Sequence, residues 1–317
     1  MPLWLTETDV RALLRPAELI GAMESALAAF SAGTVVQPVR TAFEIGERSF
    51  FAVMPAFDGA RAILGAKLVT VVPANAARGL HTHLAAISLF DAETGSLLAV
   101  MDGRYITEVR TAAVSAVSVR HLAREDAEVL AILGSGVQAR SHLELLPTVR
   151  KFSEVRVWSP TAEHRTSLRG ASAASSAEEA VRGAGVVLIA TNSVTPVIES
   201  AWVSPGAHVI AIGACRPAQR ELDPALVARA RVVVDSRAAA LQESGDIVQT
   251  IAEGRIAAEH ISAELGDVAA GRAPGRTNPQ EVTLFKSLGL AIEDVTAAAI
   301  AYRRACESNR GLHLTLT

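Results

Sequence analysis

The chain has 317 residues, of which 50% are hydrophobic and 20% charged, a composition typical of a globular protein with room for two domains. Its formal net charge of −3 at pH 7 provides no basic field, and no apolar run reaches membrane-spanning length, so neither nucleic acid nor a membrane is an expected partner. With only Cys215 and Cys306 as cysteines and no signal-peptide pattern at the N-terminus, we expect no disulfide framework and a cytoplasmic location.

The first third of the chain predicts a helix followed by a sheet. Residues 6–33 carry apolar side chains at helical spacing, with Pro16 suited to a first helical position. From Val35 to about Met101 the pattern changes to short, nearly alternating runs such as VRTAFEI, AKLVTVV and HLAAISLF. Such runs predict a mainly antiparallel sheet. The stretch 107–123, which is rich in small residues, then predicts a helix.

The next stretch, EVLAILGSGVQARSHLELL, predicts the start of a dinucleotide-binding fold. A buried strand, Val129–Leu133, stops at a G-x-G-x-x-A turn, after which the spacing becomes helical. Gly134 permits the tight bend, Gly136 allows backbone to approach a pyrophosphate, and Ala139 is small enough for close helix–strand packing. The helix N-terminus offers unpaired N–H groups to the phosphates.

After this turn the chain alternates between buried strands and helices or loops. Four Val/Ile-rich runs predict parallel strands, at 154–158, 186–190, 208–214 and 231–235. We further expect an Ala/Ser-rich helix near 171–180, a loop at 271–280 and an amphipathic helix at 288–306. The predicted fold class is α/β, with a Rossmann-type doubly wound nucleotide-binding domain and a mainly antiparallel α+β domain.

Three cations stand in apolar surroundings. Lys67 lies within AILGAKLVTVV, Arg110 within YITEVRTAAVSAVSV and Arg40 within VQPVRTAF. A buried cation is costly unless an anion meets it. Two simpler interpretations stay open, namely that Lys67 reaches the surface from an edge strand and that Arg110 pairs with Glu108 or a carbonyl group. Together, the three cations predict a site for a substrate carboxylate.

The end of the second nucleotide-fold strand bears on the choice of cofactor. NAD-specific proteins place an acid about 20 residues after the glycine turn, where it binds the ribose 2′-hydroxyl. Here the sequence is WSPTAEHR, without an acid at Ser159. Ser159 and Thr161 can bond a 2′-phosphate, and His164 or Arg165 can add positive charge. This pattern favours NADPH over NADH, the alternative being that His164 and Arg165 form the solvated face of a helix.

Several longer segments resemble the ornithine cyclodeaminase/mu-crystallin family over essentially the whole chain, namely QPVRT, AKLVT, LLAVMDGRYITEVRTAAVSA, ILGSGVQA, GACRPAQRELD, ESGD and TLFKSLGLAIED. The resemblance implies a homodimer in which residues 1–124 and 290–317 form a substrate-binding and dimerisation domain around a Rossmann domain, 125–289. It also implies that Arg40, Lys67 and Arg110 bind the carboxylate of an amino or imino acid beside the nicotinamide. Thr82 matches a family threonine or serine near substrate and cofactor, whereas His81 stands where many members have proline.

These arguments give three sets of site residues. The catalytic residues are Lys67 and Arg110, and no metal is expected. The substrate-binding residues are Arg40, Lys67, Thr82, Arg110 and Cys215. The cofactor-binding residues are Thr82, Gly134, Ser135, Gly136, Val137, Gln138, Ser159, Thr161, Arg165, Thr191, Lys286 and Ser287.

Cys215 is the main departure from the cyclodeaminase pattern, in which this position carries an aspartate that handles the substrate amine. A neutral thiol cannot hold an ammonium group as a carboxylate can, and we expect Cys215 to line the pocket rather than act as a nucleophile. The surrounding RPxxREL resembles mu-crystallin-like ketimine reductases, which also lack the acid.

The predicted activity is therefore NAD(P)H-dependent reduction of cyclic ketimines, such as pyrroline-2-carboxylate or piperideine-2-carboxylate, to cyclic L-amino acids. Three alternatives remain. They are an ornithine cyclodeaminase, an alanine-dehydrogenase-like enzyme, and a protein that binds NADPH and a small ligand without turnover.

Overall fold

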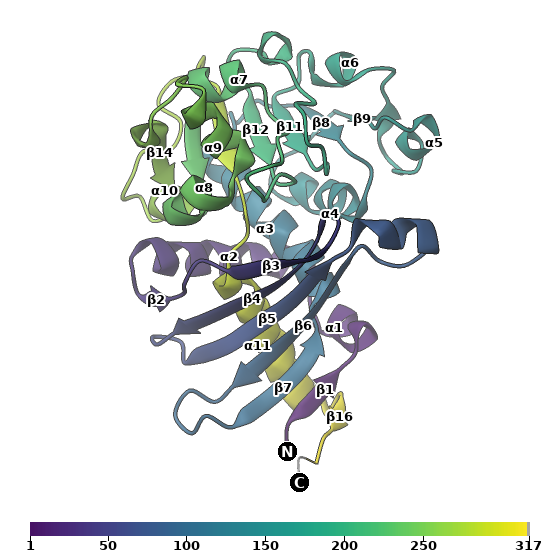
Figure 1. Cartoon of the computed structure of the whole chain (residues 1–317), viewed down its shortest axis with the longest axis vertical. Helices are drawn as coiled ribbons and strands as arrows, with labels where there is room; N and C mark the ends of the chain where they lie inside the picture. Colours follow the sequence, from purple (N-terminus) through teal and green to yellow (C-terminus); the bar gives the residue numbers. More distant parts are fainter. Residues whose placement is uncertain (316–317) are drawn as a thin grey trace. The chain divides into compact units, whose positions relative to one another are not determined.

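The computed structural model describes residues 1–315 and divides into two compact units (Figure 1). The first unit combines residues 1–110 with the C-terminal stretch that begins at Leu290, and the second spans Thr111–Gly289. The sequence placed the first boundary after residue 124, whereas the structure places it within helix α3 (Arg104–Leu122). The second half of α3 packs in the second unit because two of its serines contact histidines there. The Ser115 hydroxyl lies 2.8 Å from His142 Nε2, and the Ser118 hydroxyl lies 3.1 Å from His208 Nε2.

The first unit is built around an eight-stranded, mostly antiparallel sheet in the order β16-β1-β7-β6-β5-β4-β2, with β3 paired to β4. Helix α11 packs against α2 and against β4, β5 and β6, so the C-terminal helix covers one face of a sheet formed much earlier in the chain (Figure 1). The elements of this unit other than α3 are β1 (Leu3–Leu5), α1 (Glu7–Leu13), α2 (Pro16–Ser31), β2 (Val35–Val36), β3 (Thr41–Gly46), β4 (Ser49–Asp58), β5 (Ile63–Val71), the 3₁₀ turn η1 (Pro73–Arg78), β6 (His83–Phe90), β7 (Leu97–Asp102), α11 (Ala291–Ser308) and β16 (Leu312–His313).

The second unit is a parallel sheet of eight strands in the order β10-β9-β8-β11-β12-β15-β13-β14. Numbered along the chain, its first five positions read 3-2-1-4-5, as in the doubly wound dinucleotide-binding order, and the sixth position is taken by β15, the last strand of this unit along the chain. The predicted fold class is therefore confirmed. The elements are β8 (Val129–Leu133), α4 (Val137–Leu145), η2 (Leu146–Thr148), β9 (Glu154–Trp158), α5 (Ala162–Arg165), β10 (Ser172–Ala173), α6 (Ala177–Val181), β11 (Val186–Ile189), η3 (Ser200–Trp202), β12 (His208–Ala211), α7 (Pro224–Arg229), β13 (Arg231–Val234), α8 (Arg237–Glu243), α9 (Gly245–Ala252), η4 (Ala258–His260), β14 (Ile261–Glu264), α10 (Leu265–Ala269) and β15 (Thr283–Lys286).

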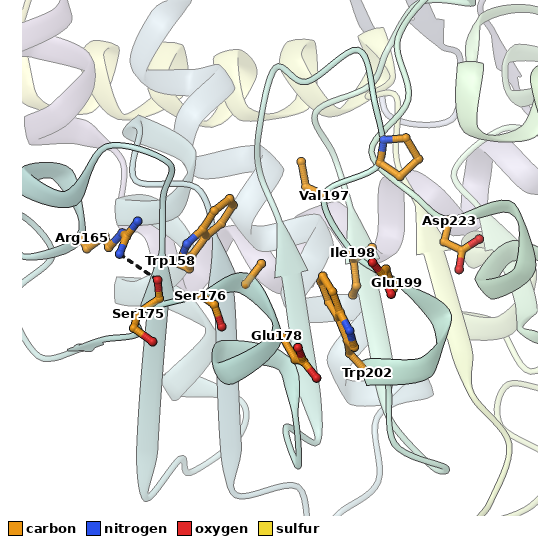
Figure 2. Close-up of a pocket in the computed structure, with 12 residues that line it drawn as sticks. Trp158, Arg165, Ser175, Ser176, Glu178, Val197, Ile198, Glu199, Trp202 and Asp223 are labelled. Atoms are coloured by element: carbon orange, nitrogen blue, oxygen red, sulfur yellow. Dashed lines mark hydrogen bonds between the residues drawn. The ribbon is translucent and has the colours of Figure 1, made fainter.

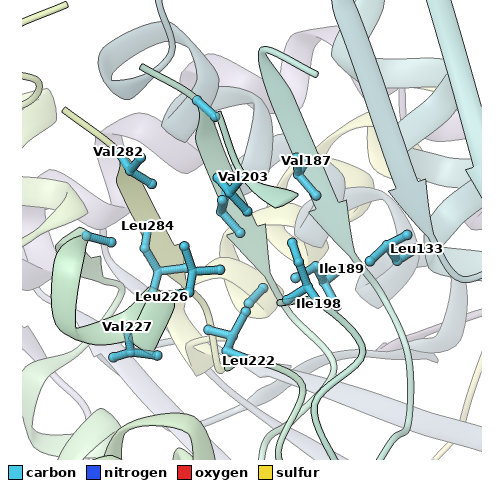
Figure 3. Close-up of a cluster of buried hydrophobic side chains, with 14 of the residues drawn as sticks. Leu133, Val187, Ile189, Ile198, Val203, Leu222, Leu226, Val227, Val282 and Leu284 are labelled. Atoms are coloured by element: carbon cyan, nitrogen blue, oxygen red, sulfur yellow. The ribbon is translucent and has the colours of Figure 1, made fainter. Parts of the chain in front are cut away.

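The core of the second unit lies between this sheet and helices α6 to α9 (Figure 3). Strand residues such as Leu133, Ile189 and Leu284 meet Leu226 and Val227 of α7 there, and all five are fully buried. Burial of both sheet faces explains why these strands read as continuous Val/Ile runs. The packed sheet provides a rigid support for the loops at its carboxyl edge.

Two local predictions were wrong, and two strands were missed. The single helix expected over 6–33 is two helices, because Arg15 precedes Pro16 and takes an extended conformation with φ −108° and ψ 109°. The Ala/Ser-rich helix expected near 171–180 is replaced by strand β10 and the short helix α6, whose N-cap is Ser176. Strands β14 and β15 were not predicted, because ISAE and TLFK each contain a charged residue and lack the continuous Val/Ile run of the other parallel strands. Within residues 1–315, no helix combines the length and apolarity needed to cross a membrane.

Candidate active-site residues

Two of the predicted cations meet buried carboxylates in the first unit. Lys67, on β5, is 2% exposed, and its Nζ lies 2.5 Å from Asp294 Oδ2 on α11. Arg110 donates from Nε to Asp294 Oδ1 at 2.9 Å and from Nη1 to Glu293 Oε2 at 2.6 Å. Strand β5 lies between β4 and β6 rather than at an edge, and the carboxylate of Glu108 pairs with Arg104. Lys67 therefore does not reach the surface from an edge strand, and Arg110 pairs with Asp294 and Glu293.

We call Lys67, Arg110, Glu293 and Asp294 the cation–carboxylate cluster. Its geometry is fixed by the close approach of α11 to β5. A Cβ added to Gly65 would lie 2.6 Å from the Ser88 carbonyl oxygen and 3.0 Å from Val295 Cγ1, so only glycine allows this packing. The first turn of α11 is also held because Gln37 Oε1 accepts a hydrogen bond from Ile292 N at 2.8 Å.

The electrostatics of the cluster favour a lysine that gives up its proton more readily than usual. Burial lowers the pKa of Lys67 to about 8, with contributions from Arg110 and Arg40, while Asp294 opposes the shift. Burial alone would raise the pKa of Asp294, but the charges of Arg110 and Lys67 outweigh it and hold that pKa below its usual range. At neutral pH the cluster therefore contains an ammonium group next to a carboxylate, and the ammonium loses its proton in mildly alkaline solution.

The other predicted substrate residues lie near the same strands. Arg40 precedes β3, is half-buried, and is close enough to Lys67 to affect its pKa. Thr82 is exposed in the loop before β6, where its carbonyl oxygen accepts a hydrogen bond from Val72 N at 2.8 Å. The neighbouring His81 carbonyl accepts a bond from Asn75 Nδ2 at 3.0 Å, which gives the loop a defined shape without the proline that many relatives have.

In the second unit, the glycine turn fits a dinucleotide. Gly134 has φ +119°, and a Cβ there would lie 2.3 Å from the Ala190 carbonyl oxygen, so this position excludes any side chain. Gly136 is the N-cap of α4, makes no side-chain capping bond, and has no atom within 4 Å of an added Cβ. Val137 and Gln138 form the first turn of α4, and Ala139 is fully buried. The turn thus leaves open space at a helix N-terminus, as a pyrophosphate requires.

The loop after β9 is held by hydrogen bonds of Ser159 and Arg165. Ser159 is 4% exposed and accepts a hydrogen bond from Ser135 Oγ at 3.2 Å. Arg165 donates to the carbonyl oxygens of Ser159 and Ser175 at 2.6 and 3.0 Å, and its guanidinium lies 5.9 Å from the Trp158 ring centre. Thr161 is exposed at the N-cap of α5. Arg165 is therefore held in place beside Ser159 rather than on a freely solvated helix face.

The side chains of Lys286 and Ser287, two predicted cofactor-binding residues, contact buried carboxylates. Lys286 Nζ is fully buried and lies 3.1 Å from Asp246 Oδ2. Ser287 is 2% exposed, and its hydroxyl donates to Asp235 Oδ2 at 3.0 Å. Lys286 thus forms an ion pair with one buried carboxylate, and Ser287 donates a hydrogen bond to another. These contacts fix the end of β15, and binding of the cofactor by Lys286 and Ser287 stays a prediction.

Thr191 and Cys215 follow neighbouring strands at the carboxyl edge of the sheet. Thr191 comes after β11, and its hydroxyl donates to Glu221 Oε1 at 2.6 Å. Cys215 comes after β12 and is half-buried, with its backbone N–H bonded to Gln219 Oε1 at 3.1 Å. The thiol Sγ lies 3.9 Å from the same oxygen. The Cys215 backbone is thus anchored and its thiol has a neutral partner.

A pocket of about 660 Å³ lies within the second unit, beside the end of β9. Figure 2 shows Trp158 and Arg165 on one side of it and Ile198 and Trp202 on the other. Acidic side chains from α6 and from the loop after β11 also line it. No residue of the glycine turn is among those that line this pocket, so it does not by itself correspond to the dinucleotide site.

Comparison with known proteins now identifies the chain's relatives. A family model for the ornithine cyclodeaminase/mu-crystallin family matches residues 2–309. The chain belongs to this family. The ketimine reductase mu-crystallin of Rattus norvegicus is 44% identical over 311 residues, covering 95% of this chain and 96% of the relative.

Solved structures agree with this assignment. The Δ1-pyrroline-2-carboxylate reductase of Thermococcus litoralis, in complex with NADH and L-proline, has a TM-score of 0.96 at 36% identity and covers 98% of this chain and 100% of that one. An archaeal alanine dehydrogenase dimer with bound NAD has a TM-score of 0.94 at 34% identity and covers 100% of this chain and 99% of that one.

For this member of the ornithine cyclodeaminase/mu-crystallin family, the structure adds residues that the sequence did not single out. Glu293 and Asp294 hold the two predicted catalytic cations, and an acidic pair within LGLAIEDVTAA was the available signal. His83 begins β6 and lies on the same sheet face as Ile87, the residue paired with Lys67. Burial, and next the charge of Lys67, lower the pKa of His83 to about 4, so its imidazole is neutral at pH 7.

Proposed function

We propose that this protein is an NAD(P)H-dependent reductase of cyclic ketimines that carry a carboxylate next to the C=N bond. The observation that carries the proposal is the cation–carboxylate cluster, in which a buried lysine with a pKa of about 8 lies beside a buried arginine. Its relatives include a ketimine reductase and a pyrroline-2-carboxylate reductase seen with L-proline. The reaction class requires an anion-binding group, a proton donor and a hydride source.

Within this proposal, the residues of the first unit bind the substrate and move its proton. Arg110 and Arg40 attract the substrate carboxylate, and Asp294 and Glu293 keep Arg110 in a fixed orientation. Lys67 transfers a proton from its ammonium group to the imine nitrogen, which makes the adjacent carbon electrophilic. Lys67 is left as a neutral amine and regains its proton from solvent. His83 remains neutral throughout and does not compete for the substrate carboxylate.

The residues of the second unit hold the cofactor. The open first turn of α4 after Gly136 receives the pyrophosphate, and Ser159, Thr161 and Arg165 lie near the adenosine ribose. A bound nicotinamide supplies the hydride that the imine carbon accepts. We propose NADPH as the preferred form, with NADH also used, because Ser159 replaces the usual acid and a held guanidinium lies beside it.

The test is a panel of cyclic ketimines and amino acids assayed with both cofactors. A ketimine reductase consumes NAD(P)H stoichiometrically with ketimine and releases no ammonia from ornithine. An ornithine cyclodeaminase releases ammonia from ornithine without net cofactor turnover, and that result would contradict the proposal. The neutral Cys215, in place of the cyclodeaminase aspartate, supports the reductase.

Oxidative deamination is the second candidate, since the archaeal alanine dehydrogenase matches this chain along its whole length. The two activities differ in the nitrogen source. A dehydrogenase working in reverse needs free ammonia together with a 2-oxo acid, whereas a ketimine reductase needs neither. Activity with pyruvate and ammonia that exceeds activity with every cyclic ketimine would favour the dehydrogenase over the reductase.

We also propose a homodimer formed through the sheet of the first unit. The sheet face opposite α11 exposes a set of apolar side chains, namely Phe43 at 56%, Ile45 at 49%, Leu68 at 41% and Leu84 at 45%. An exposed apolar group of this kind marks an interaction surface, and the related alanine dehydrogenase is a dimer. Leu68→Glu should shift the protein to monomers in light scattering, whereas the exposed control Val194→Glu should not.

The proposed location is the cytoplasm. Cys215 and Cys306 are both free thiols, and they lie in different units. A reducing compartment preserves such thiols. Fractionation of cells that express the protein tests this, and recovery with extracellular or periplasmic proteins would contradict it.

A further inference from the structure

The carboxylate of Glu221 accepts four hydrogen bonds from two separate loops of the second unit. Its Oε1 receives the backbone N–H and the hydroxyl of Thr191, at 2.8 and 2.6 Å. Its Oε2 receives the backbone N–H groups of Gly213 and Ala214, at 2.8 and 2.7 Å. The side chain is fully buried. One carboxylate therefore ties together the chain segments that leave β11 and β12.

A second layer of charge holds Glu221 itself. Asp246 Oδ1 accepts the backbone N–H groups of Glu221 and Leu222 at 2.8 and 2.9 Å, while its Oδ2 lies 3.1 Å from Lys286 Nζ. Asp246 and Lys286 are both fully buried. We call Glu221, Asp246 and Lys286 the Glu221 cluster. It links the ends of β11, β12 and β15.

Two glycines show how closely these segments approach. A Cβ on Gly213 would lie 1.8 Å from the Thr191 carbonyl oxygen, and one on Gly245 would lie 1.8 Å from the Gln219 carbonyl oxygen. Both distances are far below any real contact, so backbone packs directly against backbone. The loops around Glu221 consequently have little freedom to move independently.

The four hydrogen bonds to Glu221 match its ionised form. Burial raises the pKa of its carboxyl group and Asp246 adds to the rise, whereas Lys286 acts in the opposite direction. Four donors occupy the two oxygens, so adding a proton would displace one of the donors and leave a buried N–H or hydroxyl unpaired. Lys286 supplies the positive charge that keeps two carboxylates stable in one buried place.

The position of these loops in the sheet connects them to the cofactor. Strands β11 and β12 occupy positions 4 and 5 of the doubly wound order, and their carboxyl ends belong to the second mononucleotide-binding half. The adenosine half lies at the ends of β8 and β9, where the glycine turn and Ser159 are found. The segments that Glu221 ties together are therefore those on the nicotinamide side.

We propose that Glu221 is a positioning residue for the nicotinamide half of the cofactor, acting by fixing the backbone of Thr191, Gly213 and Ala214. Because Cys215 follows directly after Ala214, the same carboxylate also sets the direction of the side chain that separates this protein from the cyclodeaminases. The inference rests on the proposed function for the identity of the cofactor. It concerns binding geometry rather than the ketimine.

The decisive variant is Glu221→Gln, which replaces one accepting oxygen by an amide group that cannot accept the bonds made to it. Glu253→Gln is the matched control, because Glu253 also accepts hydrogen bonds, in its case from the side chain of Arg220 rather than from the backbone of these loops. NADH and ADP-ribose are the two probes, measured by titration calorimetry on the full-length protein. ADP-ribose contains the adenosine half and the pyrophosphate but no nicotinamide.

Glu221→Gln should weaken NADH binding at least tenfold and leave ADP-ribose binding within twofold of the unmodified protein. Amide hydrogen exchange should accelerate at residues 191, 213 and 214, and Glu253→Gln should change neither probe. Equal loss of both probes would show a general structural role and overturn the proposal, as would unchanged NADH binding. If Glu221→Gln does not fold, Asp246→Asn tests the same positioning role. This variant should bind NADH at least threefold more weakly and ADP-ribose with unchanged affinity.

Failure of the proposed function gives a different result. A protein that binds NADH but reduces no ketimine would contradict the reductase assignment, while the difference between NADH and ADP-ribose in Glu221→Gln would still support the positioning role.

Discussion

The two units each bury a small ionic cluster, and the clusters differ in what satisfies their carboxylates. In the cation–carboxylate cluster, Glu293 and Asp294 accept hydrogen bonds from the side chain of Arg110, and Asp294 forms an ion pair with Lys67. In the Glu221 cluster, Glu221 accepts mainly backbone N–H groups. Side-chain cations can turn towards a ligand that brings its own carboxylate, whereas backbone donors stay where the fold puts them. The first arrangement suits substrate binding and proton transfer, and the second suits a fixed scaffold.

This contrast predicts that the first cluster acts on substrate alone. Lys67→Ala or Arg110→Ala should lower kcat/KM for the ketimine at least 100-fold, on the order of 3 kcal/mol of transition-state binding, while NADH affinity barely changes. Steady-state kinetics and cofactor titration measure both quantities. Near-wild-type turnover in both variants would place the carboxylate clamp elsewhere.

Stability must be separated from catalysis in that experiment, because removing Lys67 deprives the buried Asp294 of one of its two cationic partners, and breaking a buried ion pair costs about 3–5 kcal/mol. The double variant Lys67→Ala/Asp294→Asn serves as the control. It should recover much of the lost thermal stability and none of the lost activity.

A smaller effect is expected when only the counter-ion is changed. Asp294→Asn should lower kcat/KM about tenfold near pH 7, since the cations lose the group that orients them. In the unmodified protein, activity should fall as pH rises through about 8, because Lys67 then loses the proton it donates. Asp294 raises the pKa of Lys67, so in Asp294→Asn this decline should begin at lower pH. A pH–rate profile with an unmoved alkaline limb would remove Lys67 as proton donor.

Cofactor choice should be independent of both clusters. We expect the KM for NADPH to be about tenfold below that for NADH, which corresponds to about 1.4 kcal/mol. Ser159→Asp should repel a 2′-phosphate and shift the preference towards NADH, without affecting the ketimine KM. Equal or better use of NADH by the unmodified protein would contradict the preference.

The smallest effect is expected at the residue that the Glu221 cluster positions. Cys215→Asp should weaken ketimine reduction about threefold, because an added carboxylate at a predicted substrate-binding residue repels a substrate that is itself a carboxylate. The unmodified protein should release no ammonia from ornithine, and Cys215→Ala is the control for losing the thiol without adding charge. Ammonia release from ornithine in step with proline formation would contradict the reductase assignment.

The sequence predicted features whose cause is local. The glycine turn could be recognised because Gly134, Gly136 and Ala139 act within one strand–turn–helix unit. Lys67 and Arg110 stood out because charges are rare within apolar runs. Their partners did not, since Asp294 lies 184 positions from Arg110 and no local pattern connects them. Strand β15 was missed for a related reason: Lys286 makes TLFK look unsuited to a core until its pairing with Asp246 is known.

The discontinuous first unit has a consequence for anyone who builds chimaeras from this family. The ion pair between Lys67 and Asp294 joins a residue from the N-terminal stretch to one from the C-terminal stretch. Exchanging only one of these stretches with a distant relative risks leaving a buried charge whose partner has the wrong geometry. A change of substrate specificity by domain exchange therefore requires replacing the N-terminal and the C-terminal stretch together, while the nucleotide-binding unit between them stays unchanged.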